Sequence, residues 1–375
     1  MSKQDKSAEN RAEAGRIEPF PSGKLTFLSP RPLPTGLPPV DHAHAVGDVN
    51  DTWLEFGTGV PGAFSWQVTL GGPFGGFFII AFIVPFIAAG LSMLHGYNFD
   101  QAVEVYRDMF GSGWWIAVAA GCGAFLLGYV PRWHAHSLLV YKVPTRFHRQ
   151  RREVCFVPKG EKDPIFIPWE ELVAWVTQAR GVTQYGVQHQ YGFGFGFYHP
   201  ETGEKYSLEF ETYGLPQAIS NWEAIRAYME YEVHTLKEIQ DPLELQGPDD
   251  PPWEGVHVFR NARKRLHQQY RDGEAGPLYV FGWYLFHVMT FWTLPFRLVE
   301  WEANKIRTQT RRGLPEAMVK WSEPLPESEW AKPSPELLAQ SQRVRELHQA
   351  NPRKPTTEIF AQVSEEYAEK ESMPA

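Results

Sequence analysis

The alternation of polar and apolar positions stops between Phe56 and Phe99, where no charged side chain occurs. The core of this stretch, GGPFGGFFIIAFIVPFIAAGLSML at 71–94, exceeds the ~20 apolar residues that carry a helix across a bilayer. Its Gly and Pro residues would weaken a soluble helix but are tolerated in membrane helices. The stretch therefore predicts a membrane-spanning helix. The alternative is a buried core helix, which normally keeps one polar face.

A second apolar run, GSGWWIAVAAGCGAFLLGYV at 111–130, also has the length of one bilayer crossing. Two tryptophans stand at its start, and Tyr129 and Trp133 stand at its end. This arrangement is typical of the aromatic belts at membrane interfaces. A short acidic loop joins the two runs, so residues 70–131 are expected to form a two-helix transmembrane hairpin.

Period-two alternation follows the second run and indicates β-strands. In QYGFGFGFYHP the aromatic residues fall on one face and the glycines on the other, which lets another backbone or a membrane surface approach. The pattern LPQAISNWEAIRAYMEYEV at 215–233 predicts a helix. Residues 140–236 are thus expected to form a small antiparallel β-roll, similar in kind to a pleckstrin-homology domain, capped by that helix. The predicted strands are 153–157, 163–169, 172–176, 190–200 and 206–211.

The N-terminal region, residues 1–69, is polar and rich in proline, and we expect residues 1 to about 55 to be mostly irregular. His42 and His44 stand there between Asp41 and Asp48, a pattern that a metal site would also show. A solvated linker is the simpler interpretation of these four residues.

The C-terminal third begins with VFRNARKRLHQQYRD at 258–272, a basic amphipathic pattern that suits a membrane surface. An apolar run at 277–296 follows, and basic residues flank it on both sides. A third span and an interfacial or re-entrant segment both fit this run. His287 inside it is either a proton-handling residue or a packing residue. Residues 255–312 are therefore assigned to a basic helix and an apolar membrane-associated segment, and 313–375 to a polar, helical C-terminal tail. The whole chain is expected to be an α+β membrane protein.

Charge and cysteine content narrow the function. The 375 residues carry a net charge of −8, which argues against general nucleic-acid binding. Cys122 and Cys155 are the two cysteines, so a disulfide framework or a cysteine zinc site is not available. The first long apolar run begins near residue 70, too late for a signal peptide.

A cluster of four arginines follows the second apolar run in RFHRQRR, and its members are Arg146, Arg149, Arg151 and Arg152. Basic residues near the ends of membrane helices stay on the cytoplasmic side. The pattern predicts that both flanks of the hairpin are cytoplasmic and that the acidic loop lies outside. The cluster is expected to contact the membrane surface or a partner; a nucleic-acid patch is the alternative.

Motifs of catalysis and cofactor binding are not found. The sequence has no GxSxG, no phosphate-binding glycine loop and no HExxH. His134 and His136 stand at a membrane edge, but two ligands alone do not make a metal site. We expect no enzyme activity, no cofactor and no metal.

Two segments carry a resemblance to a known family. TRFHRQRREVCFV…IFIPWEELVAWV and LPQAISNWEAIRAYME resemble a proteobacterial membrane-protein family of unknown function. The family-motif residues matched here are Pro168, Trp169, Trp222, Glu223 and Arg226, besides Arg149, Arg151 and Arg152 of the arginine cluster. Members are often found beside type VI secretion effectors. The resemblance implies an inner-membrane immunity or accessory role.

The expected function is that of a non-catalytic, multi-pass inner-membrane protein that binds a cognate toxin. Its partners would be the lipid bilayer and an effector toxin, not nucleic acid, and its oligomeric state is left open. The alternative is a membrane scaffold that reads anionic lipid or a cytoplasmic partner through the arginine cluster and the β-roll.

Overall fold

The computed structural model describes residues 12–57, 62–138, 143–158, 161–183, 186–198, 203–240, 245–251 and 253–372. The chain is an α+β protein with two antiparallel five-stranded sheets and two helices that are long and apolar. It divides into two compact units. Unit 1 contains Met1–Val60, Val143–Pro242 and Gly313–Ala375, and unit 2 contains Pro61–Lys142 and Leu243–Arg312.

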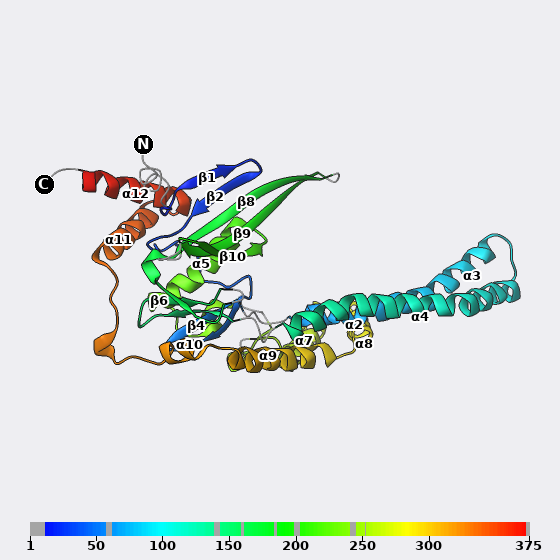
Figure 1. The fold of residues 1–375 in the computed structure, drawn as a ribbon. Coiled ribbons are helices and arrows are strands. Elements are labelled where there is room, and N and C mark those ends of the chain that lie inside the picture. Colours follow the sequence, from blue (N-terminus) through cyan, green and yellow to red (C-terminus); the bar gives the residue numbers. More distant parts are fainter. Residues whose placement is uncertain are drawn as a thin grey trace. The chain divides into compact units, whose positions relative to one another are not determined.

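The first sheet of unit 1 joins strands from the N-terminal region to strands from the predicted β-roll (Figure 1). Each neighbouring pair is antiparallel. Phe27 pairs with Trp175, so the N-terminal hairpin extends the sheet of the roll. In spatial order the strands are β1 (Ile17–Phe20), β2 (Gly23–Phe27), β8 (Val173–Thr183), β9 (Gly186–Tyr198) and β10 (Lys205–Thr212).

The second sheet is assembled in the same way. Its strands, in spatial order, are β3 (Val46–Val49), β4 (Trp53–Phe56), β5 (Thr145–His148), β6 (Glu153–Phe156) and β7 (Ile165–Pro168). Most of residues 12–57 are irregular, as expected, but the region also supplies four short strands that were not expected. The sheets therefore include strands outside the predicted β-roll at 140–236. Without β2 and β4, the strands β8 and β5 would have unpaired edges.

The aromatic and glycine positions of β9 lie on opposite faces, as predicted, but the group that approaches Gly194 is a side chain and not another backbone or a membrane. Phe193, Phe195 and Phe197 are buried on one face. On the other face, the indole of Trp175 covers Gly194 so closely that an added Cβ would lie 2.6 Å from its ring. The glycine thus allows a close approach that no larger residue would permit.

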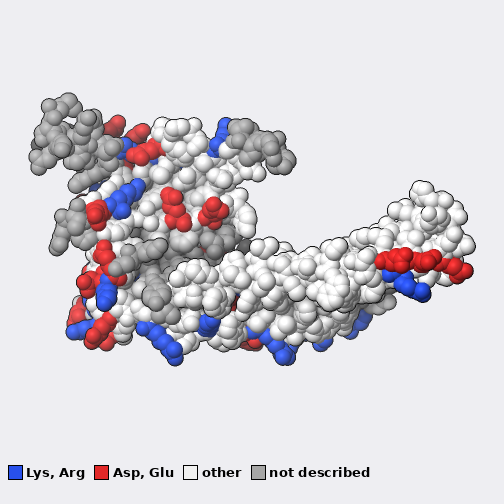
Figure 2. All heavy atoms as spheres, turned by 45° about the vertical axis from the view of Figure 1, so that its right-hand side comes forward, with Lys and Arg blue, Asp and Glu red and all other residues white. Residues whose placement is uncertain are grey.

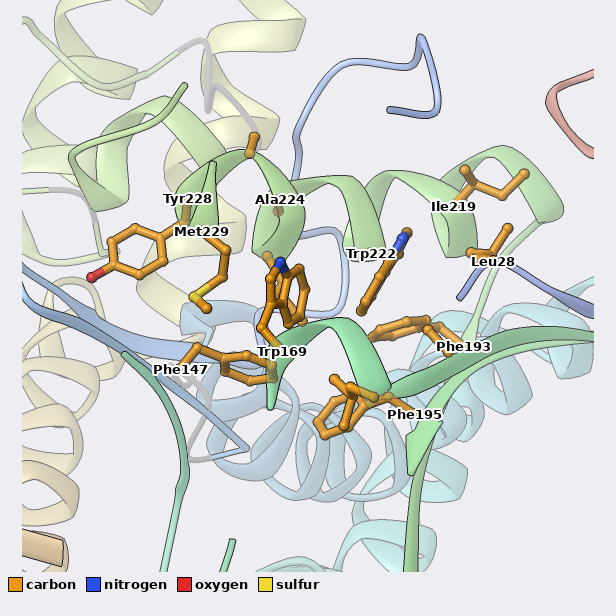
Figure 3. Packing of buried hydrophobic residues seen from close by; sticks show 14 of the residues in the cluster. Leu28, Phe147, Trp169, Phe193, Phe195, Ile219, Trp222, Ala224, Tyr228 and Met229 are labelled. Atoms are coloured by element: carbon orange, nitrogen blue, oxygen red, sulfur yellow. The ribbon is translucent and has the colours of Figure 1, made fainter. Parts of the chain in front are cut away.

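One helix packs against the first sheet and completes the core of unit 1 (Figure 3). This helix, α5 (Leu215–Met229), was predicted at 215–233, and it begins with Pro216 in its first turn. Trp222 points from α5 toward Phe193 and Trp169, and the two indole rings have centroids 5.2 Å apart. Trp169 follows β7 in a short 3-10 helix, Trp169–Glu171.

The C-terminal region is helical but is not a free tail. Its helices are α10 (Glu316–Trp321), α11 (Pro335–Ala350) and α12 (Thr356–Ser372), with a 3-10 turn at Glu327–Glu329. Ser334 caps α11 by accepting a hydrogen bond from the N–H of Leu337 at 3.1 Å. Phe360 of α12 and Val344 of α11 are fully buried in the core of unit 1.

Unit 2 is built on two long helical stretches. The first runs through α2 (Ala63–Phe78), a π-helical segment (Ile79–Ile83) and α3 (Val84–Leu94). The wide turn comes just before Pro85, which has no N–H to donate to the carbonyl four residues earlier. The second stretch is α4 (Phe99–Ser137), which lies along α2 and α3 (Figure 1).

The connection between α3 and α4 is shorter than the predicted acidic loop. It comprises residues 95–98, and Asp100, Glu104 and Asp108 lie in the first turns of α4. The rings of Phe77 and Trp114 meet across the two stretches with centroids 5.2 Å apart. These contacts fix the alignment of α4 against α2.

Three further helices complete unit 2. They are α7 (Val256–Arg271), α8 (Pro277–Met289) and α9 (Leu294–Arg312). The amphipathic helix predicted at 258–272 is confirmed, with Phe259 and Leu266 buried. The apolar run at 277–296 does not form one helix, because the chain turns between α8 and α9. Among the described residues, Ala63–Leu94 and Phe99–Ala135 are the two helices with the length and composition to cross a membrane.

Candidate functional site

Arg146 is the first residue of the predicted arginine cluster, and it lies inside unit 1. Its Nε donates to Glu55 Oε1 at 3.0 Å, and its Nη1 donates to Ser322 Oγ at 2.8 Å. The guanidinium lies 4.1 Å from the centre of the Trp53 ring. Only 5% of Arg146 is exposed. This arginine joins β5 to β4 and to the C-terminal region.

Arg149 is buried in a similar setting. Its Nη2 donates to Asp51 Oδ1 and its Nε to the Asp51 carbonyl, both at 2.9 Å. The guanidinium lies over the rings of Tyr228 and Tyr231, with distances to the centroids of 5.0 and 4.6 Å. Burial raises the pKa of Tyr228 beyond its ordinary value, so this hydroxyl stays protonated and donates to the carbonyl of Asn50 at 2.9 Å.

Arg152 binds Glu230 with both terminal nitrogens, at 3.0 and 2.9 Å, and Nη2 also reaches Glu170 at 3.3 Å. The same Glu230 accepts a hydrogen bond from Trp169 Nε1 at 3.0 Å. Such bidentate contacts are the strong form of an arginine–carboxylate pair. Arg151 is partly buried and donates from Nε to the carbonyl of Trp321 at 3.1 Å.

The prediction of an exposed arginine surface is therefore wrong for Arg146, Arg149 and Arg152. Their carboxylate partners, Asp51, Glu55 and Glu230, come from segments far away in the sequence, so the local pattern showed only the positive half of each pair. A buried charge needs such a partner to offset its lost hydration. The cluster holds the sheets and helices of unit 1 together and presents little free charge to a membrane.

The family-motif residues gather around α5. Glu223 accepts hydrogen bonds from the backbone N–H of Thr35 at 3.0 Å and from Arg226 Nε at 2.9 Å. Burial opposes the charge of Arg226, but Glu223 and Glu232 raise its pKa above the ordinary value. Pro168 ends β7 and positions Trp169 against Trp222. Four of these five residues are buried and form packing and ion-pair contacts of the core, whereas Pro168 is exposed.

Two buried groups near the cluster have shifted pKa values. Burial lowers the pKa of His148 to about 4, and the charge of Arg151 lowers it as well. The His148 ring packs edge-on against Trp321 with centroids 5.0 Å apart. Burial also raises the pKa of the Cys155 thiol to about 12. Both groups are neutral at pH 7, so neither supplies a cation or a reactive thiolate there.

Metal ligands are not assembled in the part of the chain that the structure describes, where no three His, Cys, Asp or Glu side chains come together. The His42–His44 segment is an ordered turn and not a solvated linker. Asp41 is buried there, and its carboxylate accepts hydrogen bonds from the N–H of Ala45 at 3.2 Å and of Val46 at 2.7 Å. The side chain of His136 lies outside the described residues.

A polar cluster of unit 2 was not predicted. Glu302 of α9 accepts a hydrogen bond from Trp66 Nε1 at 2.6 Å and forms an ion pair with Arg132 at 2.9 Å. The Arg132 guanidinium also lies 4.0 Å from the centre of the Trp66 ring. Trp66 lies near the start of the first apolar stretch and Arg132 near the end of the second. This matching position at the helix ends was the one signal in the sequence that could have indicated the cluster. We call these three residues the helix-end cluster.

The two apolar helical stretches expose most of their side chains. Only 11% of the most apolar window of the first stretch is buried inside the protein, and 6% of that of the second. Phe86 and Leu127 are 70% and 79% exposed. Figure 2 shows the corresponding surface as a long tract nearly free of charged side chains. A groove of 480 Å³ runs between α2 and α4, lined by apolar residues such as Phe77 and Phe125.

His287 lies in α8 with its ring stacked on Trp283, at 3.8 Å between centroids, and its Nδ1 lies 2.8 Å from the Trp283 carbonyl. Phe259 of α7 packs against the same ring. These contacts support the packing interpretation of His287.

Comparison with known protein families, with curated protein sequences and with solved structures gives no match for this chain. The candidate sites are therefore defined by their own geometry: a buried arginine–carboxylate cluster in unit 1, and an exposed apolar surface with the helix-end cluster in unit 2.

Proposed function

We propose that the chain is a multi-pass membrane protein whose α2–α3 stretch and α4 cross the bilayer as a hairpin. The exposed apolar surface of these helices carries the proposal. A 32-residue helix is roughly 48 Å long, more than the ~30 Å of the hydrocarbon core. A soluble protein rarely exposes an apolar surface of this extent, because each Å² of apolar surface left in water costs about 25 cal/mol of free energy. The alternative of a soluble core helix would need most of this surface to be covered.

Charge supports an orientation with unit 1 in the cytoplasm of a bacterial inner membrane. The connecting end of the hairpin carries Asp100, Glu104 and Asp108 against a single Arg107. The opposite end holds Arg132 and the basic helices α7 and α9. Basic residues near membrane ends favour the cytoplasmic side.

The membrane assignment is tested by extraction of the full-length protein from bacterial membranes. Alkaline carbonate removes peripheral proteins, whereas detergent is needed for a protein with membrane-spanning helices. We expect the chain to stay in the carbonate pellet and to enter solution with mild detergent. Recovery in the soluble fraction without detergent would contradict the assignment.

We further propose that the membrane-anchored chain is a non-catalytic binding protein whose partner is a cognate effector toxin. The sequence resemblance to proteins beside type VI secretion effectors supports this choice of partner. The largely neutral and ion-paired groups of unit 1 suit a binding scaffold, since an immunity protein needs affinity and no catalytic group. Unit 1 would act by covering a surface of the toxin that the toxin needs for its own activity.

A genetic experiment tests the toxin proposal. Deletion of the gene is expected to harm the cell only when a neighbouring effector is present, and the purified full-length protein is expected to bind that effector. Survival of the deletion strain against every neighbouring effector would contradict it.

The second candidate, a scaffold that reads anionic lipid through the arginine cluster, has lost its main support. Three of the four arginines are buried in ion pairs. The exposed basic residues of α7 lie in unit 2.

A further inference from the structure

Helices α7, α8 and α9 lie at one shared end of the two apolar helical stretches. Glu254, just before α7, accepts a hydrogen bond from the N–H of Ala63 at the start of α2. Glu302 of α9 contacts both Trp66 near the start of α2 and Arg132 near the end of α4. If the stretches cross a bilayer, these contacts hold α9 at the level of the membrane surface, with Trp66 in the interfacial region.

This part of the chain is strongly basic in an otherwise acidic protein. Residues 256–312 contain ten Lys and Arg and four Asp and Glu, a net charge of +6, whereas the whole chain carries −8. Helix α7 has five basic residues and no acidic one. Arg260, Arg263, Lys264 and Arg271 are exposed and follow the helical spacing of one face, which adjoins the side that carries the buried Phe259 and Leu266.

Helix α8 packs against α7 through Trp283 and Phe259, and it exposes apolar side chains of its own. Leu278 is 81% exposed, Phe281 63% and Leu285 49%. The helix has 13 residues, or about 20 Å, which is too short to cross the ~30 Å hydrocarbon core. After it, the chain reverses through two left-handed residues, Phe291 and Trp292, with φ of 63° and 59°.

The depth of this turn in the proposed membrane follows from its contact with α2. The ring of Phe291 packs on that of Phe74, with centroids 5.3 Å apart. Phe74 lies eight residues beyond Trp66, or about 12 Å along the helix. With Trp66 at the interface, the turn lies at about the depth of a single leaflet, half of the ~30 Å core.

We propose that α7, α8 and α9 form a docking element for anionic phospholipid, in which α8 enters one leaflet only and the exposed face of α7 binds the headgroups. The inference rests on the proposed membrane insertion of α2–α3 and α4. Nucleic acid would satisfy the basic face of α7, but it gives no role to the exposed apolar face of α8. A re-entrant α8 also keeps α7 and α9 on the same side of the membrane, which a third span would not.

Lipid retention tests the headgroup contact. The full-length protein and the triple variant Arg260→Gln, Arg263→Gln, Lys264→Gln are reconstituted in nanodiscs of equal phosphatidylcholine and phosphatidylglycerol, re-extracted in mild detergent, and analysed for bound lipid. One basic residue near an anionic surface changes affinity by about fivefold. We expect the ratio of bound phosphatidylglycerol to phosphatidylcholine to fall by about fivefold or more in the variant.

A matched control removes three exposed basic residues of unit 1, through Arg180→Gln, Lys205→Gln and Lys332→Gln. This variant is expected to keep the lipid ratio of the unaltered protein. An equal ratio in all three proteins would overturn the proposal, and so would an equal fall in the control.

The depth of α8 is tested with a polarity-sensitive label at Leu285→Cys in a Cys122→Ser background, with Cys155 buried. Lipids carrying a quencher midway along the acyl chain are expected to quench the label, and aqueous iodide to leave it bright. Quenching by iodide as strong as at a label on Tyr213→Cys would overturn the proposal. Failure of the membrane assignment is separate, because it would release the whole protein in alkaline carbonate, whereas failure here leaves it in the pellet.

Discussion

The guanidinium of Arg132 lies 2.9 Å from the carboxylate of Glu302, although 170 residues separate them in the sequence. The pair joins the end of α4 to α9, and Trp66 of α2 donates to the same carboxylate. Three helices thus meet at one largely buried charge pair. In the proposed membrane protein, this pair sets the level at which the two spans leave the bilayer.

Removal of one partner of this pair is expected to destabilise unit 2. The side chains of Arg132 and Glu302 are only 15% and 7% exposed, so Arg132→Leu leaves a nearly buried carboxylate without its cation. Such a loss costs about 3–5 kcal/mol. The double variant Arg132→Leu, Glu302→Leu should lose clearly less stability than the two single variants lose when their losses are added. Thermal unfolding in mild detergent measures the coupling, and strict additivity would contradict a direct interaction.

The core of unit 1 is expected to depend on Trp222. This side chain is fully buried between Trp169 and Phe193, and its truncation in Trp222→Ala leaves a cavity. We expect a loss of about 3–5 kcal/mol in the free energy of unfolding. Tyr213→Ala is the control, because Tyr213 is 96% exposed and its loss should change stability by less than about 0.5 kcal/mol. Equal effects of the two changes on chemical denaturation would refute this packing.

A glycine pair on neighbouring strands tests the close approach of Trp175. A Cβ at Gly194 would lie 2.6 Å from the indole, whereas a Cβ at Gly181 would meet nothing within 4 Å. Gly194→Ala should cost about 1–3 kcal/mol through overpacking. Gly181→Ala should be neutral or slightly stabilising, because it lowers the entropy of the unfolded chain. The prediction fails if both variants show the same denaturation midpoint.

Stability of unit 1 is expected to fall on mild acidification because of His148. Its pKa is about 4 in the folded protein and 6.5 for the free side chain, so the unfolded chain binds the extra proton between these values. The contribution of His148 to the free energy of unfolding is fully present above pH 6.5. It is lost as the pH falls toward 4, and the loss is at most about 3 kcal/mol. His148→Gln should make the decline between pH 7 and pH 5 shallower than in the unaltered protein. Parallel declines would show that His148 is not responsible.

Elements whose signal is local could be predicted from the sequence. The two apolar stretches, the strand β9 with its glycine face, and the helices α5, α7 and α11 all follow a periodic pattern or a cap within a few residues. The four N-terminal strands could not be predicted in this way. Each has only four or five residues within a segment rich in proline, and the two hairpins join their sheets through β2 and β4, which pair with β8 and β5 far along the chain.

The arginine cluster shows the same limit for a candidate site. The charge of Arg146 is visible in the sequence, but its burial depends on Glu55, which becomes a neighbour only when β4 pairs with β5. The helix-end cluster was missed for the same reason. A charged residue can be interpreted as a surface or as a core group only when its partner is known.

Access to the short connection between α3 and α4 tests the central claim most directly. In intact bacterial cells that express a variant without Cys122, a membrane-impermeant maleimide is added to single-site variants Tyr97→Cys and Tyr213→Cys. The account predicts that the cysteine at position 97 reacts in intact cells and that the one at position 213 reacts only after permeabilisation. Protection of position 97 in intact cells, with equal reaction of both sites after lysis, would contradict a hairpin that crosses the membrane with unit 1 inside.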